Sequence, residues 1–235
     1  GSGGTWYVDD SGSDSNPGTS SGSPFLTIER AFEVSCSNDI IEIGAGTYAW
    51  YDVSTTSSSA QTIRGAGVSS TYIQNTGYAD TDSRALYCKN SGLTLEDMTF
   101  RYYRHDDLGG AIYSTKAITF NRVNFTDNQG GDATYGGGAV AVIYGSASAA
   151  TMEFNSCVFT DNIVSGSGAS NGGGGAVLGY GSGSGVDVLN MTFTSCTFTG
   201  NKTLSSSTSQ DGGAVYANNV GTVTVSKSKF YTNHS

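Results

Sequence analysis

The segment Arg101–Asp107 holds the densest group of reactive side chains in this 235-residue chain and reads RYYRHDD. A histidine beside two carboxyl groups could cleave a glycosidic bond, because an inverting hydrolase needs an acid and a base about 6.5 to 9.5 Å apart. Residues adjacent in sequence seldom flank a sugar at that separation, so we expect no catalytic site. The alternative hypothesis is a carbohydrate-active or glycan-binding site on four residues of this segment, Arg104, His105, Asp106 and Asp107.

A second group of oxygen-bearing side chains lies near the N-terminus. Asp10, Asp14 and Asn16 alternate along the chain as ligands do in a calcium-binding loop, but the acidic residue that closes an EF-hand loop is missing. We therefore expect neither a metal ion nor a cofactor. The alternative metal ligands are Asp10 and Asp14.

Two short motifs alternate along the second half of the chain. They indicate the repeating strands that would position a catalytic or metal site. A glycine pair followed by Ala and an aliphatic residue begins each unit, and a Phe-x-x-Asn motif ends it. The glycine motifs start at Gly109, Gly136, Gly172 and Gly212, and the Phe-x-x-Asn motifs end at Asn128, Asn162, Asn201 and Asn233. Repetition of this kind predicts a solenoid whose stacked coils share one core.

Alignment of the coils on the Phe of each motif places apolar residues seven, five and two positions before it. The spacing of two indicates a strand with one face inward, and the central spacing of three, which holds two polar residues, indicates a corner. The inward Phe column comprises Phe100, Phe125, Phe159, Phe198 and Phe230. The pattern predicts an all-β fold, a right-handed single-stranded parallel β-helix of about seven coils.

The Asn at the end of each motif should stack on its equivalent one coil away. Amide side chains at the ~4.8 Å strand spacing can hydrogen-bond along the axis, so Asn128, Asn162, Asn201 and Asn233 are expected to form a ladder. The glycine pairs are expected to adopt positive φ and to turn the chain tightly into the next strand.

Cys157 and Cys196 occupy the same inward column of successive coils. Their α-carbons should therefore lie near the ~4.8 Å strand spacing, which is within the range of a disulfide. Stacked β-carbons point in parallel, so we expect adjacent free thiols and keep a Cys157–Cys196 disulfide as the alternative. The other candidate pair is Cys36 with Cys88.

The first hundred residues lack the repeat and predict a cap. We expect an amphipathic helix capped by Ser23, with Pro24 in its first turn and with Ile28, Ala31 and Phe32 on its apolar face, which covers the open edge of the first strand. The chain is expected to be one domain over residues 1–235, with a cloning remnant at 1–4, a cap and first coil at 5–48, early coils at 49–108 and repeat coils at 109–235.

The last coil is expected to be uncapped. Val223, Val225 and Phe230 should then be exposed unless another coil covers them, either from a longer chain or from a second copy. Insertions at 129–135, 163–171 and 202–211 make the coils unequal in length and should emerge from one edge, where solenoids usually bind partners.

Composition narrows the functional classes. The net charge is −9 with only 11 Lys and Arg, which argues against nucleic acid as a partner. No stretch reaches the ~18 to 20 apolar residues of a transmembrane helix, so we expect no transmembrane segment in this chain. The 34 glycines and 13% charged residues are typical of a turn-rich extracellular all-β protein.

Two resemblances extend these predictions. Residues Trp6 to about Gly67, with the Trp-Tyr-Val strand and the Asn-Pro-Gly-Thr loop, resemble the N-terminal region of the pectate-lyase-like superfamily of parallel β-helices. From Gly109 to Asn233 the alternating motifs resemble those of polymorphic outer membrane proteins, the surface adhesins of chlamydiae. The resemblance implies a non-catalytic secreted or cell-surface scaffold, either an adhesin or a filament-forming protein. Its implied partners are a host or neighbouring-cell surface, a glycan, or copies of itself stacked end to end.

Overall fold

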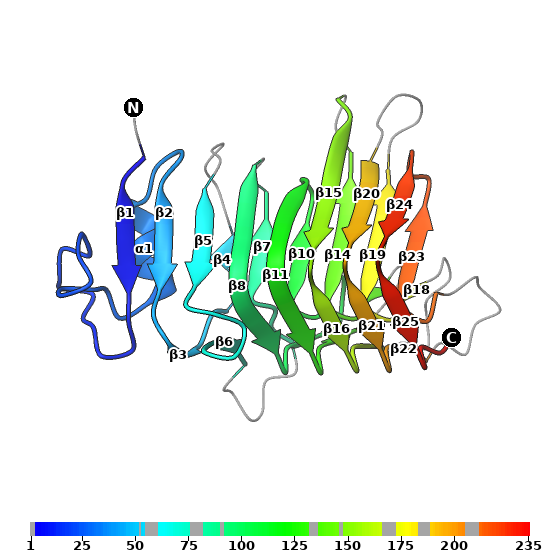
Figure 1. Cartoon of the computed structure of the whole chain (residues 1–235), viewed down its shortest axis with the longest axis horizontal. Coiled ribbons are helices and arrows are strands. Elements are labelled where there is room, and N and C mark those ends of the chain that lie inside the picture. Colours follow the sequence, from blue (N-terminus) through cyan, green and yellow to red (C-terminus); the bar gives the residue numbers. More distant parts are fainter. Residues whose placement is uncertain are drawn as a thin grey trace.

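The strands stack side by side along the long axis of the molecule, from β1 at the N-terminal end to β24 at the C-terminal end (Figure 1). The computed structural model describes residues 3–51, 53–54, 61–75, 82–89, 92–131, 136–145, 148–165, 173–182, 189–204 and 212–235. Gly1, Ser2 and Gly172 lie outside the described residues, as do most of the expected insertions, at 132–135, 166–171 and 205–211.

The first sheet contains 13 strands. Its main path is β1 (Thr5–Val8), β2 (Ile40–Ile43), β5 (Thr62–Gly65), β8 (Leu93–Arg101), β11 (Ile118–Thr126), β15 (Ala150–Asn155), β20 (Leu189–Thr194) and β24 (Val223–Ser226). The other members are β3 (Gly46–Tyr48), β6 (Thr71–Gln74), β16 (Val158–Thr160), β21 (Thr197–Thr199) and β25 (Lys229–Tyr231). Neighbouring strands are parallel, and motif residues pair with their equivalents, as Phe125 does with Phe100 and Phe159.

Smaller parallel sheets form the other faces of the coils. The second sheet consists of β4 (Val53–Ser54), β7 (Leu86–Cys88), β10 (Ile112–Ser114), β14 (Val140–Tyr144), β19 (Val177–Gly181) and β23 (Val215–Asn218). The third sheet consists of β9 (Arg104–His105), β12 (Gln129–Gly130), β17 (Ile163–Val164) and β22 (Lys202–Thr203). A two-stranded sheet pairs β13 (Gly136–Gly137) with β18 (Gly173–Gly174). Successive coils stacked through parallel sheets are the predicted parallel β-helix.

Each coil bends where the sequence places two adjacent polar residues, as predicted. The second residue of each pair adopts a left-handed backbone with φ between 53° and 57°, at Asp97, Arg122, Ser156, Ser195 and Lys227. The chain turns again directly before the Asn column, where Asp127 and Asp161 have φ of 52° and 53°. The first bend lies within the first sheet, and the second separates the first sheet from the third. The coils enclose a shared interior.

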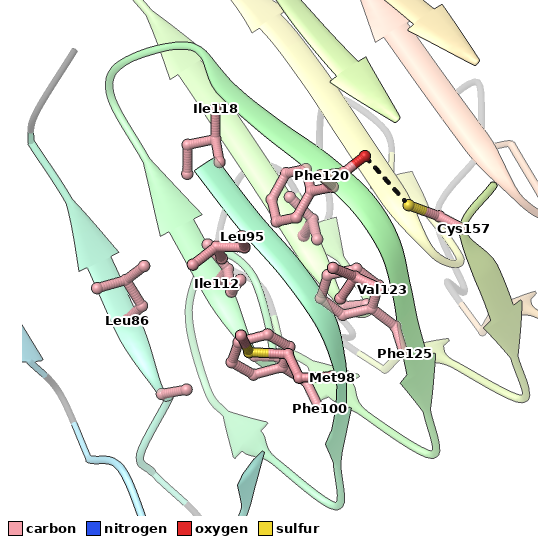
Figure 2. Packing of buried hydrophobic residues seen from close by; sticks show 14 of the residues in the cluster. Leu86, Leu95, Met98, Phe100, Ile112, Ile118, Phe120, Val123, Phe125 and Cys157 are labelled. Carbon is pink, nitrogen blue, oxygen red and sulfur yellow. Dashed lines mark hydrogen bonds between the residues drawn. The ribbon is translucent and has the colours of Figure 1, made fainter. Parts of the chain in front are cut away.

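That interior is filled by the predicted apolar columns, and Figure 2 shows side chains of β8 and β11 pointing into it together. Ring centroids are 5.5 Å apart for Phe100 and Phe125, 5.0 Å for Phe125 and Phe159, 4.6 Å for Phe159 and Phe198, and 4.7 Å for Phe198 and Phe230. The first four rings are fully buried, whereas Phe230 in the last coil is 46% exposed.

The asparagine ladder is present and saturates its hydrogen bonds. Oδ1 of Asn162 accepts bonds from both the backbone N–H and Nδ2 of Asn128, at 3.1 and 3.0 Å. Nδ2 of Asn162 donates in turn to Oδ1 of Asn201 and to the carbonyl of Phe125. Tyr103 ends the ladder at its N-terminal side, where its N–H donates to Oδ1 of Asn128. Buried amides that satisfy one another in this way fix the register of the coils.

The glycine pairs are explained by close approach and not, as predicted, by positive φ. Among the described motif glycines, Gly109 alone has a positive φ, of 68°. A β-carbon on Gly137 would lie 2.2 Å from the carbonyl oxygen of Val140, and one on Gly174 would lie 1.9 Å from that of Val177. The backbone doubles back so closely that no side chain fits.

The N-terminal helix begins later than predicted. Helix α1 (Ile28–Val34) is capped by Thr27, whose side chain accepts a bond from the N–H of Arg30, and not by Ser23. The cause is Phe25, which forms a parallel bridge to Val8 and is therefore extended.

The helix also does not cover the edge of the first strand. It lies behind β1 and β2 (Figure 1), with Ile28 and Ala31 buried in the core. The outer edge of β1 is bonded instead by the loop that precedes the helix. The N–H of Tyr7 donates to the carbonyl of Gly18 at 2.8 Å, and the N–H of Phe25 donates to the carbonyl of Tyr7 at 2.8 Å.

Candidate functional site

The reactive segment identified in the sequence forms β9 and the turn after it, on the third sheet. Its neighbour is the segment around Ser83, because the N–H of Ser83 donates to the carbonyl of Arg104 at 2.9 Å in an antiparallel bridge. The N–H of Asp106 donates to Oδ1 of Asp82 at 3.1 Å. Two segments about 20 residues apart therefore meet on the outside of the β-helix.

The side chain of Arg84 lies at the centre of this meeting point and is only 7% exposed. Its Nη2 atom lies 2.8 Å from Nδ1 of His105 and 4.0 Å from Oδ2 of Asp107. Its guanidinium carbon lies 5.2 Å from the centre of the Tyr113 ring. A buried guanidinium held between a ring, an imidazole and a carboxylate fixes the positions of all three groups.

His105 is held in place by the same turn. The N–H of Asp107 donates to Nδ1 at 3.0 Å, and Nη2 of Arg84 lies 2.8 Å from Nδ1 and 2.7 Å from Nε2. Oδ1 of Asp82 lies 3.5 Å from Nδ1 and would pair with the imidazolium if the ring took up a second proton.

An aromatic pair adjoins the polar group on the second sheet. The rings of Tyr87 in β7 and Tyr113 in β10 stack at 4.8 Å with an interplanar angle of 16°, and Nζ of Lys89 lies 4.3 Å from the centre of the Tyr87 ring. Burial raises the pKa of Tyr113, and the nearby Tyr87 and Asp107 raise it further. The Tyr113 hydroxyl stays protonated at neutral pH as a result.

The structure places the four candidate residues of the segment 104–107 in different surroundings. His105 and Asp107 join the group around Arg84. Arg104 points to the next coil, where its Nη1 bonds to Oε1 of Gln129. Asp106 contributes a backbone N–H, and its residue is exposed.

Asp82, Arg84, Tyr87 and Tyr113 were missed because they lie one coil before or after the segment. A signal was present, since RALYC at 84–88 aligns with GAIYS at 110–114, and the two strands pair in that register.

The group is open to solvent. The Asp82 and Asp107 side chains are 57% and 61% exposed, so water reaches both carboxylates. Exposed carboxylates beside tyrosine rings can accept hydrogen bonds from the hydroxyls of a ligand.

The predicted metal ligands do not form a site as a pair. Oδ1 of Asp14 accepts bonds from the N–H groups of Leu26 and Thr27, both at 2.9 Å, and its Oδ2 accepts one from the Thr27 hydroxyl. Asp14 thus orders the chain ahead of α1. Among the described residues, no cluster of three or more His, Cys, Asp or Glu side chains could hold a metal ion.

The cysteines are free thiols in this structure, including Cys36 and Cys88. Sγ of Cys157 contacts the carbonyl oxygen of Phe120 at 3.6 Å (Figure 2), and Sγ of Cys196 contacts that of Phe154 at 3.2 Å. Burial raises the pKa of Cys157. The two thiols of the shared column therefore serve as small apolar fillers.

Comparison with protein families matches residues 195–218 to the Chlamydia polymorphic membrane protein (Chlamydia_PMP) repeat. The matched stretch runs from the first bend of one coil, through the Phe198 and Asn201 motif, to the end of β23. It therefore contains the same two motifs that recur in the preceding coils. Comparison with curated protein sequences gives no match.

Among solved structures, a rhamnogalacturonan lyase is 18% identical with a TM-score of 0.50, over 93% of this chain and 63% of that one. The pectate lyase Pel9A is 14% identical with a TM-score of 0.49, over 100% of this chain and 79% of that one. The chain thus spans less than two thirds of the length of the rhamnogalacturonan lyase. Identity at this level shows the fold alone, and the fold is the right-handed parallel β-helix predicted from the repeat. In the described part of the chain, no helix has the length and apolarity to cross a membrane.

Proposed function

We propose that this chain is a non-catalytic extracellular or cell-surface scaffold of the adhesin type. The observation that carries the proposal is the match of residues 195–218 to a repeat named for a polymorphic membrane protein, in a chain that repeats the same motifs coil after coil. The inward columns and the Asn ladder are occupied by packing and by hydrogen bonds to each other. The outer surface is left to bind a host or neighbouring-cell surface.

The experiment that tests this proposal measures binding and catalysis on the same protein. The chain is applied to a glycan array and to cultured cells, and it is incubated in parallel with uronic-acid polymers. We expect saturable binding without depolymerisation. Depolymerisation that is lost in His105→Asn or Asp106→Asn would overturn the non-catalytic proposal and favour a β-helix polysaccharide lyase or glycoside hydrolase.

A glycan-binding site at the Arg84 group is the second candidate function. It is supported by the meeting of Asp82 and Asp107 with the stacked Tyr87 and Tyr113 on one open surface. Carboxylates accept bonds from sugar hydroxyls, and tyrosine rings offer apolar edges to sugar rings. This arrangement favours neutral sugars, because two exposed carboxylates repel an anion.

Isothermal titration with the glycans that bind on the array tests the second candidate. Asp107→Asn and Tyr113→Phe should weaken binding at least several-fold. Asp161→Asn is the matched control, because it removes an exposed carboxylate from the turn before β17, two coils away from β9. Equal affinities for the Asp107 and Asp161 variants would place the glycan site elsewhere.

A further inference from the structure

The hydroxyl group of Tyr48 is buried and faces the backbone N–H of Asp10 without forming a hydrogen bond of normal geometry. Tyr48 ends β3, is 5% exposed, and its oxygen makes no hydrogen bond of normal geometry to the described residues. An unsatisfied buried hydroxyl costs about 1 to 3 kcal/mol, so native structures usually provide a partner.

Two carboxylates and two glycines surround this hydroxyl. A β-carbon on Gly46 would lie 3.2 Å from the Tyr48 oxygen and 2.7 Å from Oδ2 of Asp10. A β-carbon on Gly44 would lie 3.4 Å from the same oxygen and 2.4 Å from Oδ2 of Asp9. The Tyr48 oxygen therefore lies near Oδ2 of Asp9 beside Gly44 and near Oδ2 of Asp10 beside Gly46, where neither glycine carries a side chain.

The chain orients one of these carboxylates in advance. The N–H of Ser11 donates to Oδ1 of Asp9 at 3.0 Å, and the Ser11 hydroxyl donates to the same oxygen. Oδ2 is thereby left as the oxygen that faces Gly44.

The phenol oxygen of Tyr48 can act as an uncharged oxygen ligand.

We propose that Asp9, Asp10 and Tyr48 bind a hard divalent cation through these three oxygens, and that the cation is calcium. Calcium accepts six to eight oxygen ligands in flexible geometry and completes its shell with water, whereas magnesium requires a near-ideal octahedron. Two carboxylates and a phenol make a weak site, in the range of about 0.1 to 1 mM that is usual for extracellular modules. Asp9 takes the place that the sequence gave to Asp14, because Asp14 is bonded to Leu26 and Thr27.

The bound cation would tie the turn after β1 to the turn between β2 and β3. Asp9 and Asp10 follow β1 directly, and Gly44, Gly46 and Tyr48 lie in the following coil. The expected consequence is stabilisation of the N-terminal end by calcium, in proportion to how far its concentration exceeds the dissociation constant.

Calorimetric titration with calcium chloride and thermal unfolding with and without calcium test the proposal. We expect one weak site on the whole chain and a rise in Tm with calcium, both lost in Asp9→Asn and Asp10→Asn. Tyr48→Phe keeps the ring and the packing, and should weaken calcium binding several-fold. The controls are Asp161→Asn, which removes an equal charge elsewhere, and circular dichroism, which reports folding of each variant.

A spectroscopic measurement isolates Tyr48. Calcium should lower the pH at which one tyrosine ionises in an ultraviolet titration, because a nearby cation stabilises the phenolate. The proposal is overturned if calcium at about 10 mM, above the range of extracellular modules, produces neither heat nor a Tm shift. It is equally overturned if Asp9→Asn and Asp161→Asn respond to calcium alike.

Discussion

The first and last coils of this chain differ in how their outer edges are covered. At the N-terminal end the loop from Gly18 to Phe25 bonds the outer edge of β1, and Phe25 is 2% exposed beneath it. At the C-terminal end Val223, Val225 and Phe230 are 42%, 49% and 46% exposed, although their equivalents one coil earlier are buried.

The difference shows what a repeat sequence can and cannot do. The same apolar columns that bury one another in the middle of the β-helix become an exposed surface in the last coil. Closing an edge therefore takes sequence that breaks the repeat, such as the loop from Gly18 to Phe25. Comparing equivalent residues along one column separates the effect of stacking from the effect of residue type.

The largest expected effect is in the Phe column. Phe159→Ala should destabilise the protein by about 3 to 5 kcal/mol, because Phe159 is fully buried and stacked on Phe125 and Phe198. Phe230→Ala should cost less than half as much, because Phe230 is stacked on one side and half exposed. Chemical denaturation measures both free energies. Thr160→Ala, on the outer face, is the control and should have little effect; equal losses for the Phe159 and Thr160 variants would contradict the column assignment.

In the Asn ladder too, a substitution in a middle coil should lower the free energy of unfolding more than one in the last coil, although by less than in the Phe column. Asn162→Ala removes the acceptor of Asn128 and the donor to Phe125, and each orphaned buried group costs about 1 to 3 kcal/mol. Asn233→Ala breaks equivalent bonds, but water at the open end replaces them. If the two variants unfold at the same denaturant concentration, ladder position has no influence on stability.

Breaking the closed end should destabilise it and expose a new edge. A β-carbon on Gly18, where φ is 68°, would lie 2.1 Å from a ring carbon of Phe25, and the left-handed backbone alone costs about 1 to 2 kcal/mol. Gly18→Ala should lower the Tm and increase self-association in sedimentation. Gly22→Ala is the matched control, because a β-carbon there meets nothing within 4 Å; if it behaves like Gly18→Ala, the loop does not protect β1.

Acid should loosen the closed end first. Burial raises the pKa of Asp39, but bonds from the Cys36 N–H, Trp6 Nε1 and the Gly4 N–H outweigh burial and lower it overall. The resulting stabilisation is present above the unfolded pKa of about 3.9 and is lost as the pH falls through the lower folded value.

Trp6 fluorescence and denaturation at neutral and acid pH measure this loss. Asp39→Asn should remove part of the pH dependence. Residues 212–235 contain no Asp or Glu, so the C-terminal coil should not respond in this range. An acid transition that begins in the C-terminal coil in hydrogen exchange would contradict the prediction.

Substitutions in the C-terminal coil should change stability least. Their effect is measured by self-association of the chain. The N-terminal edge is already bonded, so we predict that copies associate through their C-terminal ends. Val225→Glu places a charge on that end and should prevent association while changing stability by less than about 0.5 kcal/mol. Thr224→Glu adds the same charge on the outer face of β24 and should leave association intact. A monomeric wild-type chain at high concentration, with residues 223–233 protected in hydrogen exchange, would show that the last coil needs no neighbour.

Much of the fold could be predicted from the sequence because a solenoid repeats local rules. The spacing of apolar residues before Phe125 and Phe159 determined the strands and the corner, since each position meets its own equivalent one coil away. The Asn ladder followed for the same reason. The reason for the glycine pairs was wrong, because close approach of two backbones depends on how far the chain doubles back and not on local motif alone.

The N-terminal cap and the polar groups around Arg84 and Tyr48 were decided by tertiary structure. Phe25 is extended because β1 bonds it, which moved the start of α1 to Ile28. Arg84 meets His105 and Asp107, and Tyr48 meets Asp9 and Asp10, across coils of unequal length. Each of these contacts occurs only once in the described part of the chain, so the repeat pattern of the sequence could not predict it. The sequence by itself determined the apolar columns and the Asn ladder, because stacking requires the same residue types in every coil. The contacts that occur once depended on the register of the coils and on loop length, which only the folded chain decides.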